Sequence, residues 1–383
     1  MGYLRQKKIL NRGELERSES AVPSRVGFLE RWFKISRLSY PVPPHARMLP
    51  YTLGGITFVG FLLLFVSGLI LGQFYNPAPE SAYESIKYVV KEVPGGTFLR
   101  AFHYWTAQAV VFVLLLHMLR VFVTGAYKAP RLFTWYFGVV LLATTLLGPY
   151  FSGTVLKWDQ ESFEALAHYR EGLRFLGPIG EFIGSVEAVP LNIKLYLSHI
   201  SFFPLLLVVL ILGHFYLINV FNLSPLPFGE DSARAHVPSE RMTGKFLEHS
   251  KSIVLYSVIY YTLVTIVSLM IPAPLGPPNS GEEVGSKPPW PFLWLYGLEN
   301  LTGRSDTLIY ATGVFFILLI LLPLLDRGPE RNPMKRIGTM AGGAIILLLI
   351  ISFSIYALVA PLKVHQHGGD EAPHSDDEAH DDS

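Results

Sequence analysis

The chain has 383 residues, half of them hydrophobic and 16% charged, with a formal net charge of +1. This balance argues against a nucleic-acid partner, which favours a strongly basic surface. The absence of cysteine excludes disulfides, iron–sulfur ligation by this chain and any thioether-linked haem.

Seven long apolar runs predict an all-α, polytopic membrane helical bundle. Each run is near the ~20 residues that a membrane-spanning helix needs. The runs are continuous rather than alternating, which argues against strands, because an open sheet cannot satisfy its backbone in lipid. The runs cover, in round figures, residues 52–75, 99–123, 133–151, 198–221, 252–273, 306–325 and 338–361.

These runs divide the chain into five predicted parts. Residues 1–50 are expected to be a cytoplasmic extension without a signal peptide, since they lack an apolar h-region. Residues 51–222 hold four spans, 223–250 form a polar inner linker, and 251–361 hold three more spans with an outer Pro/Gly-rich loop. Residues 362–383 are rich in His, Asp and Glu and are expected to be disordered.

The longest outer loop, at about 152–197, is too long to be structureless, so short helices are expected in it, for example at 161–170.

Basic residues predict the orientation of the chain. They crowd the first 50 residues and recur at 128–131, 234–245 and 327–336. All of these segments lie on one side if there are seven spans, so the N-terminus is expected inside and the C-terminus outside.

Four histidines lie within the predicted spans, and their spacing is informative. His103 and His117 are 14 residues apart, and His199 and His214 are 15 apart. On a helix these intervals rise about 21 and 22 Å and return to within about 40° and 60° of the starting direction. Each helix would therefore present two imidazoles on nearly one face, one toward each side of the membrane.

This arrangement predicts two bis-histidine haems stacked across a core about 30 Å thick. Imidazole suits iron, and two axial ligands leave no open position for dioxygen, which favours electron transfer. Antiparallel helices would pair His103 with His199 outside, and His117 with His214 inside. A lone intramembrane histidine more often bonds to a neighbouring helix, but two matched pairs argue against that alternative.

Two kinds of neighbour fit the haem interpretation. Arg100 and Arg120 lie one turn beyond His103 and His117, toward the two surfaces, where haem propionates must point. Gly54 and Gly68 are 14 residues apart and would let a flat macrocycle approach the first span. The alternatives are snorkelling at helix ends for the arginines and close helix packing for the glycines.

The chain resembles cytochrome b of the Rieske/cytochrome b (cytochrome bc-type) quinol-oxidising complexes. The resemblance covers about 35–361, with features of the chloroplast-type branch and the two parts of that branch fused in one chain. The matching stretches are 42–45, 53–57, 98–103, 117–135 and 157–160.

The resemblance implies two non-covalent b-type haems, a quinol-oxidising pocket near the outer haem and a quinone-reducing pocket near the inner one. It also implies a Rieske-type iron–sulfur subunit, c-type cytochrome partners and a dimeric complex in a prokaryotic-type cell membrane.

Two departures from the family pattern matter. The outer-loop signature Pro-Glu-Trp-Tyr reads Pro288-Pro289-Trp290-Pro291 here, followed by Phe292, so the carboxylate that would take a quinol proton is absent at Pro289. Pro289, Trp290, Phe292 and Glu299 are the quinol-site candidates, with Glu282 and Glu283 as further substitutes for the base. The cysteine that would anchor the family's third haem by a thioether bond is absent near Thr52. A third haem near the inner site could therefore bind only without a covalent bond.

The predicted function is the di-haem subunit of a quinol:cytochrome c, or similar, oxidoreductase that translocates protons. A haem-b membrane anchor for a peripheral dehydrogenase or reductase is the alternative, which the outer loop with Trp290 disfavours. A transporter with a histidine proton relay is a more distant one.

Overall fold

The structure is a computed structural model that describes residues 40–185, 189–281 and 285–362. Most of the predicted N-terminal extension, Glu282, Glu283 and nearly all of the predicted tail lie outside the described residues. Seven helices in the described part are long and apolar enough to cross a membrane, as predicted. They are α3 (Leu49–Leu71), α5 (Gly96–Val123), Leu132–Val155, Leu191–Phe221, α12 (Phe246–Met270), α14 (Thr307–Leu325) and α15 (Ile337–Val359).

Two of these spans contain a wide π-helical turn. The third runs from α6 (Leu132–Thr145) through η3 (Leu146–Tyr150) to α7 (Phe151–Val155). The fourth runs from α10 (Leu191–Leu197) through η4 (Ser198–Phe202) to α11 (Phe203–Phe221). Pro149 lies inside the first turn, and Pro204 follows the second. Proline has no backbone N–H to donate to the regular ladder, and a π turn accommodates the missing bond without ending the helix.

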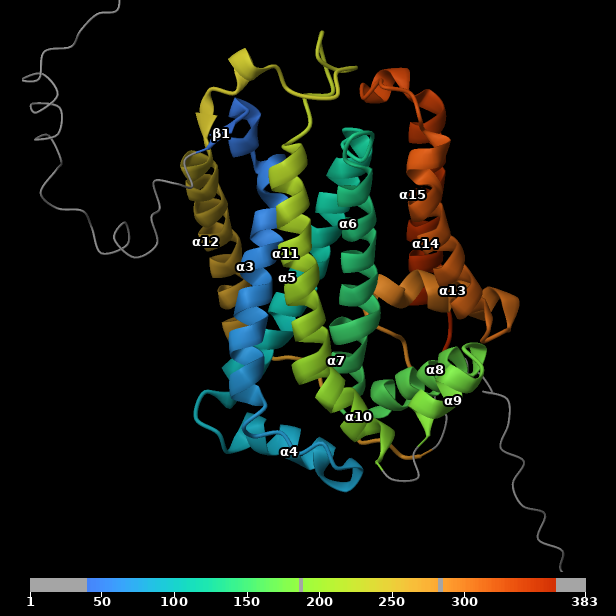
Figure 1. The fold of residues 1–383 in the computed structure, drawn as a ribbon. Coiled ribbons are helices and arrows are strands. Elements are labelled where there is room, and N and C mark those ends of the chain that lie inside the picture. Colours follow the sequence, from blue (N-terminus) through green and yellow to red (C-terminus); the bar gives the residue numbers. More distant parts are fainter. Residues whose placement is uncertain (1–39, 186–188, 282–284, 363–383) are drawn as a thin grey trace, which may run out of the picture.

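The spans stand side by side as one bundle (Figure 1). α3, α5, α6 and α11 form the centre, α12 packs against α3 and α5, and α14 packs against α6. The hydroxyl of Tyr261 on α12 donates to the carbonyl of Ile56 on α3 at 3.0 Å. Trp135 on α6 donates its indole N–H to the carbonyl of Leu319 on α14 at 2.8 Å. Both bonds satisfy polar groups that lipid could not.

Short elements cover the two ends of the bundle (Figure 1). The end that carries the antiparallel pairing of β1 (Pro41–Val42) with β2 (Gly244–Lys245) is called the β1 end. The opposite end, which carries α8 (Gln160–Phe175), is called the α8 end. A short helix was predicted at 161–170, and α8 confirms it, whereas α4 and α13 were not predicted. At the β1 end lie β1 (Pro41–Val42), η2 (Pro44–Arg47), η5 (Ser239–Arg241), β2 (Gly244–Lys245) and η7 (Pro333–Lys335). At the α8 end lie α4 (Pro79–Lys91), α8 (Gln160–Phe175), α9 (Pro178–Gly184), η6 (Trp290–Phe292) and α13 (Leu293–Thr302).

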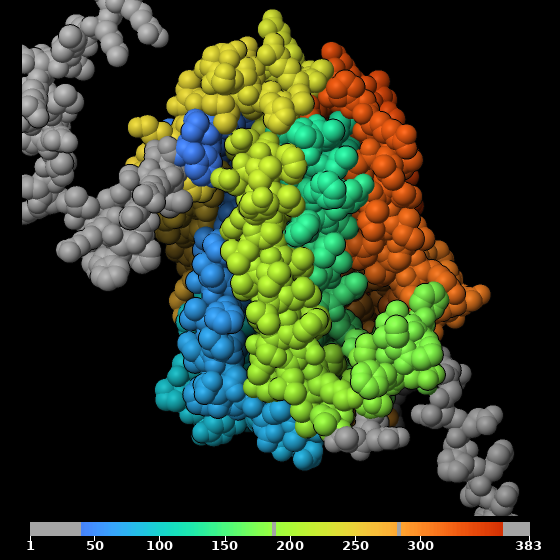
Figure 2. All heavy atoms as spheres, in the orientation of Figure 1, coloured from blue at the N-terminus to red at the C-terminus, as the bar shows by residue number. Residues whose placement is uncertain are grey.

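The outer faces of the spans are apolar, as expected of an integral membrane protein. Figure 2 shows α11 over nearly the full height of the front face. Leu205, Val209, Leu212 and Tyr216 follow one another at helical spacing along it and are 59–68% exposed. A surface of this kind needs lipid rather than water against it.

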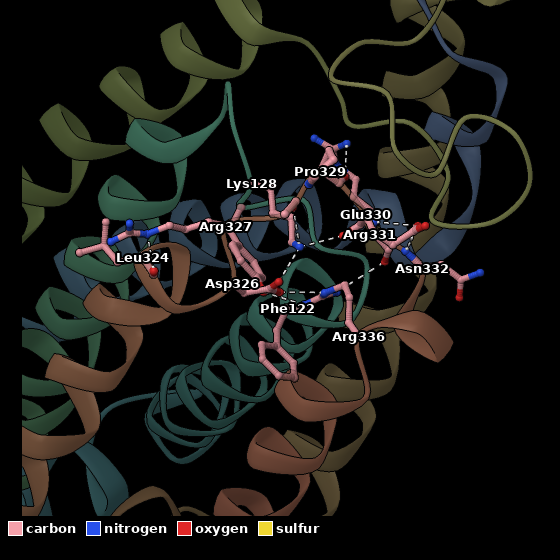
Figure 3. Close-up of polar contacts among 12 residues, drawn as sticks. Phe122, Lys128, Leu324, Asp326, Arg327, Pro329, Glu330, Arg331, Asn332 and Arg336 are labelled. Atoms are coloured by element: carbon pink, nitrogen blue, oxygen red, sulfur yellow. Dashed lines mark hydrogen bonds and ion pairs between the residues drawn. The ribbon is translucent and has the colours of Figure 1, made fainter.

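A buried polar cluster joins the turn after α5 to the turn between α14 and α15 (Figure 3). Asp326 accepts bonds from Lys128 Nζ at 2.6 Å, Tyr127 Oη at 2.5 Å and Arg336 Nε at 2.8 Å. Arg336 also donates to the carbonyls of Phe122 and Val123. Those carbonyls close α5, where the helix dipole attracts a cation.

The cluster places more positive than negative charge in a buried region. Burial by itself raises the pKa of Asp326, but hydrogen bonds from Lys128 and Tyr127 and the charge of Arg336 outweigh it and hold the pKa below its usual range. The carboxylate therefore stabilises the fold at neutral pH, and this contribution is lost only as the pH falls through the lowered pKa.

We expect Asp326→Asn to destabilise the protein by about 3–5 kcal/mol, because it leaves Lys128 and Arg336 buried without their counter-charge. The measurement is thermal unfolding of the purified protein in detergent at neutral pH. The matched control is Asp306→Asn, which breaks only the exposed ion pair with Arg304 and should change the unfolding temperature little. Equal effects of the two variants would contradict a structural role of the cluster.

Candidate functional site

The histidines nearer the α8 end, His103 on α5 and His199 on η4, face each other. Their ring centroids are 6.4 Å apart and their planes are inclined by 62°. Two metal–imidazole bonds of about 2 Å, together with the distance from each ring centre to its nitrogen, span this separation. One metal ion therefore fits between the two rings.

Serine hydroxyls hold both of these rings in the same tautomer. Ser67 Oγ lies 2.9 Å from His103 Nδ1 and donates its one proton to the carbonyl of Leu63 at 2.8 Å. Ser152 Oγ lies 2.9 Å from His199 Nδ1 and donates to the carbonyl of Gly148 at 2.8 Å. Each hydroxyl must then accept from an Nδ1–H, which leaves the Nε2 lone pair of the imidazole for a metal.

Sequence reasoning missed these serines, although a signal was present. Ser67 precedes Gly68 and Ser152 precedes Gly153, and both glycines lie against the same rings. A Cβ at Gly68 would lie 3.1 Å from His103 Cε1, and one at Gly153 would lie 3.1 Å from His199 Cε1. A Ser-Gly dipeptide opposite each histidine is therefore the local pattern of this pair.

The second pair, His117 and His214, lies toward the β1 end. A Cβ at Gly54 would lie 3.1 Å from His117 Cε1, and one at Gly138 would lie 3.9 Å from His214 Cε1. His117 Nδ1 is buried and has no hydrogen-bond partner among the described residues. A glycine lies against each imidazole of the second pair as well, as it does in the first pair.

The two arginines hold backbone carbonyls beside the histidine pairs. Arg100 donates to the carbonyls of Ala273 and Pro274 at 2.7 and 2.6 Å. Arg120 donates through Nε to the carbonyl of Pro50 at 3.1 Å, and its guanidinium lies 4.9 Å from the centre of the Tyr51 ring. Neither forms an ion pair within the described part of the chain, although the Asp159 carboxylate lies near enough to Arg100 to act on its charge.

Trp290 and Phe292 pack between α5 and the third span. We call these two residues, together with Gln108, Tyr150 and Phe151, the Trp290 cluster. Gln108 Oε1 accepts from Trp290 Nε1 at 2.9 Å and from Tyr150 Oη at 2.6 Å. The Phe292 ring lies 5.9 Å from that of Tyr150 and 6.4 Å from that of Phe151. Gln108 and Tyr150 were missed from the sequence, because nothing local links them to a loop about 140 to 180 residues away.

Pro289 and Glu299 stand on either side of this cluster along the chain. Pro289 precedes η6 and carries no proton-accepting group. Glu299 on α13 is fully buried, and burial, then the neighbouring carboxylates of Glu171 and Glu164, raises its pKa to about 8. A carboxyl group with such a pKa can exchange its proton near neutral pH, which makes Glu299 a candidate functional residue.

Comparison with known proteins agrees with this geometry. Residues 37–222 match the family described as Cytochrome b/b6/petB. Cytochrome b6 of Heliobacterium mobile is 34% identical over 191 residues, which are 48% of this chain and 89% of that protein. A cytochrome bc complex cytochrome b subunit of Chlorobaculum thiosulfatiphilum is 27% identical over 335 residues, 84% of this chain and 77% of that protein.

A solved structure shares the fold of nearly the whole chain. It is described as a hyperthermophilic respiratory Complex III and aligns with a TM-score of 0.71 at 23% sequence identity. The alignment covers 86% of this chain and 90% of that chain. The fold therefore extends through the three later spans, beyond the matched family region.

We expect Gly68→Val to lower the haem content of the purified protein severalfold, because the branched side chain would occupy the space against the His103 ring. Haem is measured by the pyridine haemochrome spectrum per mole of protein. Gly313→Val on α14 is the control, since a Cβ there meets nothing within 4 Å. Full haem content in the Gly68→Val protein would contradict the proposed contact.

Proposed function

The chain belongs to the cytochrome b/b6 family, and from this premise we propose that it is the di-haem cytochrome b subunit of a quinol:cytochrome c, or similar acceptor, oxidoreductase. The single observation that carries the proposal is the arrangement of two histidine pairs, one toward each end of the same helices. His103 and His199 would bind one b-type haem, and His117 and His214 the other, both without covalent attachment.

The residues present fit such a group. The separation of the His103 and His199 rings suits one iron, and the glycine behind each ring lets the imidazole lie close to the neighbouring helix. Bound haem b supplies transfer of one electron at a time. The histidines would hold the iron, Ser67 and Ser152 hold the imidazole tautomer that can ligate it, and Arg100 and Arg120 would balance the charge of the propionates.

Quinol oxidation is assigned to the Trp290 cluster at the α8 end. Because Gln108 Oε1 already accepts two bonds, its amide nitrogen is oriented as a donor for a quinol oxygen. Trp290, Phe292 and Tyr150 supply aromatic surface for the quinol ring. The continuous apolar walls of the spans exclude water between the two ends.

Quinone reduction is assigned to the β1 end, beside His117 and His214. With the N-terminus inside, protons are released outside at the α8 end and taken up inside at the β1 end, so turnover adds to a proton gradient. The partners are a Rieske-type iron–sulfur subunit and c-type cytochrome, because this chain has no cysteine for either centre, and the complex is expected to be dimeric. A third, non-covalent haem near the inner site remains open.

The proposal is tested on the native complex by reduced-minus-oxidised spectroscopy and haem quantification. Two b-type haems per chain and reduction by added quinol are expected. His117→Ala should lose one haem quantitatively and leave the spectrum of the other intact, because each pair binds separately. Unchanged haem content in His117→Ala would contradict the haem assignment itself. The absence of a co-purifying iron–sulfur subunit from the wild-type protein would favour the membrane-anchor alternative.

Ser67→Ala is expected to raise the midpoint potential of the outer haem alone. An imidazole that donates its Nδ1–H is a stronger ligand and stabilises the oxidised iron, and removal of the acceptor weakens this effect. A tenfold change in the redox equilibrium corresponds to about 59 mV for one electron, so shifts below that size are expected in potentiometric titration. Ser354→Ala, which removes a bond within α15 only, is the control and should leave both potentials unchanged.

A further inference from the structure

Glu299 is a fully buried acid that lies outside the histidine pairs and the Trp290 cluster. Its side chain is 0% exposed, and α13 holds it against α8 at the α8 end of the bundle (Figure 1). The facing ionisable groups on α8 are His168, Glu164 and Glu171. Among the other elements packed on α13, α15 presents the backbone carbonyl of Phe353 and the methyl group of Ala357 at Gly297. On the side of α14, Arg304, Asp306 and Tyr310 line a groove together with Leu298 of α13.

His168 lies between Glu299 and a more exposed acid. His168 Nε2 is 3.9 Å from Glu299 Oε2, and His168 Nδ1 is 3.8 Å from Glu171 Oε2. The side chains of His168 and Glu171 are 22% and 16% exposed. The three groups thus lead from a fully buried carboxyl, through an imidazole with a nitrogen toward each neighbour, to an acid that solvent reaches.

The helix α13 connects the buried end of this series to the Trp290 cluster along the chain. Phe292, Tyr296 and Glu299 follow at intervals of four and three residues, so they lie on one face as α13 begins. Seven residues of helix rise about 10 Å, and the buried Tyr296 occupies the turn between. At the other end, Phe292 packs on Tyr150 and Phe151 within the cluster.

We propose that Glu299, His168 and Glu171 conduct protons from the quinol site to the α8 surface, in place of the carboxylate that is missing at Pro289. This proposal rests on the proposed quinol-oxidising function. Oxidation of the quinol breaks both O–H bonds, and each proton in turn reaches the ionised Glu299 carboxylate across the turn that the buried Tyr296 occupies. Each proton then moves to one nitrogen of neutral His168 while the proton on the other nitrogen leaves for Glu171 and solvent. The two electrons would pass to two one-electron acceptors, a b-type haem and the iron–sulfur partner.

The electrostatics of Glu299 suit this role. Burial, with Glu171 and Glu164 as smaller contributors, raises its pKa to about 8, and a base works best with a pKa near the working pH. Because only the ionised form accepts a proton, the rate of quinol oxidation should rise with pH and level off above about 8. Removal of the like charge at Glu164 should lower the pKa and move the rise to lower pH.

The test measures quinol-dependent haem reduction in the purified complex from pH 5.5 to 9.5. Glu299→Gln imitates the neutral carboxyl, so it should fold, and it should slow the reduction about 100-fold, the usual contribution of a general base, and abolish the pH dependence. Glu299→Asp should restore part of the rate. His168→Gln should slow the reduction as well, whereas Glu164→Gln should keep the maximal rate and shift the profile to lower pH.

An infrared difference spectrum between oxidised and reduced complex gives a second readout. A carboxylic acid carbonyl band that disappears in Glu299→Gln, but not in the exposed control Glu84→Gln, is expected. If Glu299→Gln retains both haem spectra and the wild-type pH profile, the proton pathway is wrong and the proposed function stands. If the wild-type complex is not reduced by quinol at any pH, the proposed function itself is wrong.

Discussion

The placement of two imidazole pairs inside an apolar bundle is the constraint on which the other features depend. A histidine in hydrocarbon needs partners for both nitrogens. At the α8 end, one nitrogen faces a serine at 2.9 Å and the other is left toward the facing ring. The adjacent glycines admit the ring itself. His199 lies within the π-helical turn Ser198–Phe202, so a local widening of the helix sets the position of its side chain.

Buried charges are compensated differently at the two ends of the bundle. At the β1 end, buried cations donate to helix carbonyls and to one carboxylate, Asp326, so that no proton needs to move. At the α8 end, Lys157 compensates Asp159 and Glu161, but Glu299 faces a histidine and further acids. The carboxyl groups around Glu299 can therefore accept and release protons, which the proposed quinol oxidation requires.

Sequence patterns were sufficient for the spans but not for their ends. The predicted fourth span began near 198, whereas the helix begins at Leu191 and continues through a π turn, because backbone hydrogen bonding continues where hydropathy falls. α4 was missed because the helix lies outside the spans and buries only one face, with Ala82, Ile86 and Val89. The bonds of Ser67, Ser152 and Trp290 were missed because their partners are 36, 47 and 182 residues away, beyond any local periodicity.

The sequence by itself determined the number of spans, the lack of any thiol ligand and the common face of each histidine pair. These properties follow from hydropathy, composition and the 3.6-residue period, all of which act locally along the chain. Only the tertiary structure decided that serines orient His103 and His199, that Gln108 and Tyr150 meet Trp290, and that Glu299 is buried beside His168. Those features depend on how α13, α8 and the spans pack together, because burial and hydrogen-bond partners are set by contacts between distant segments.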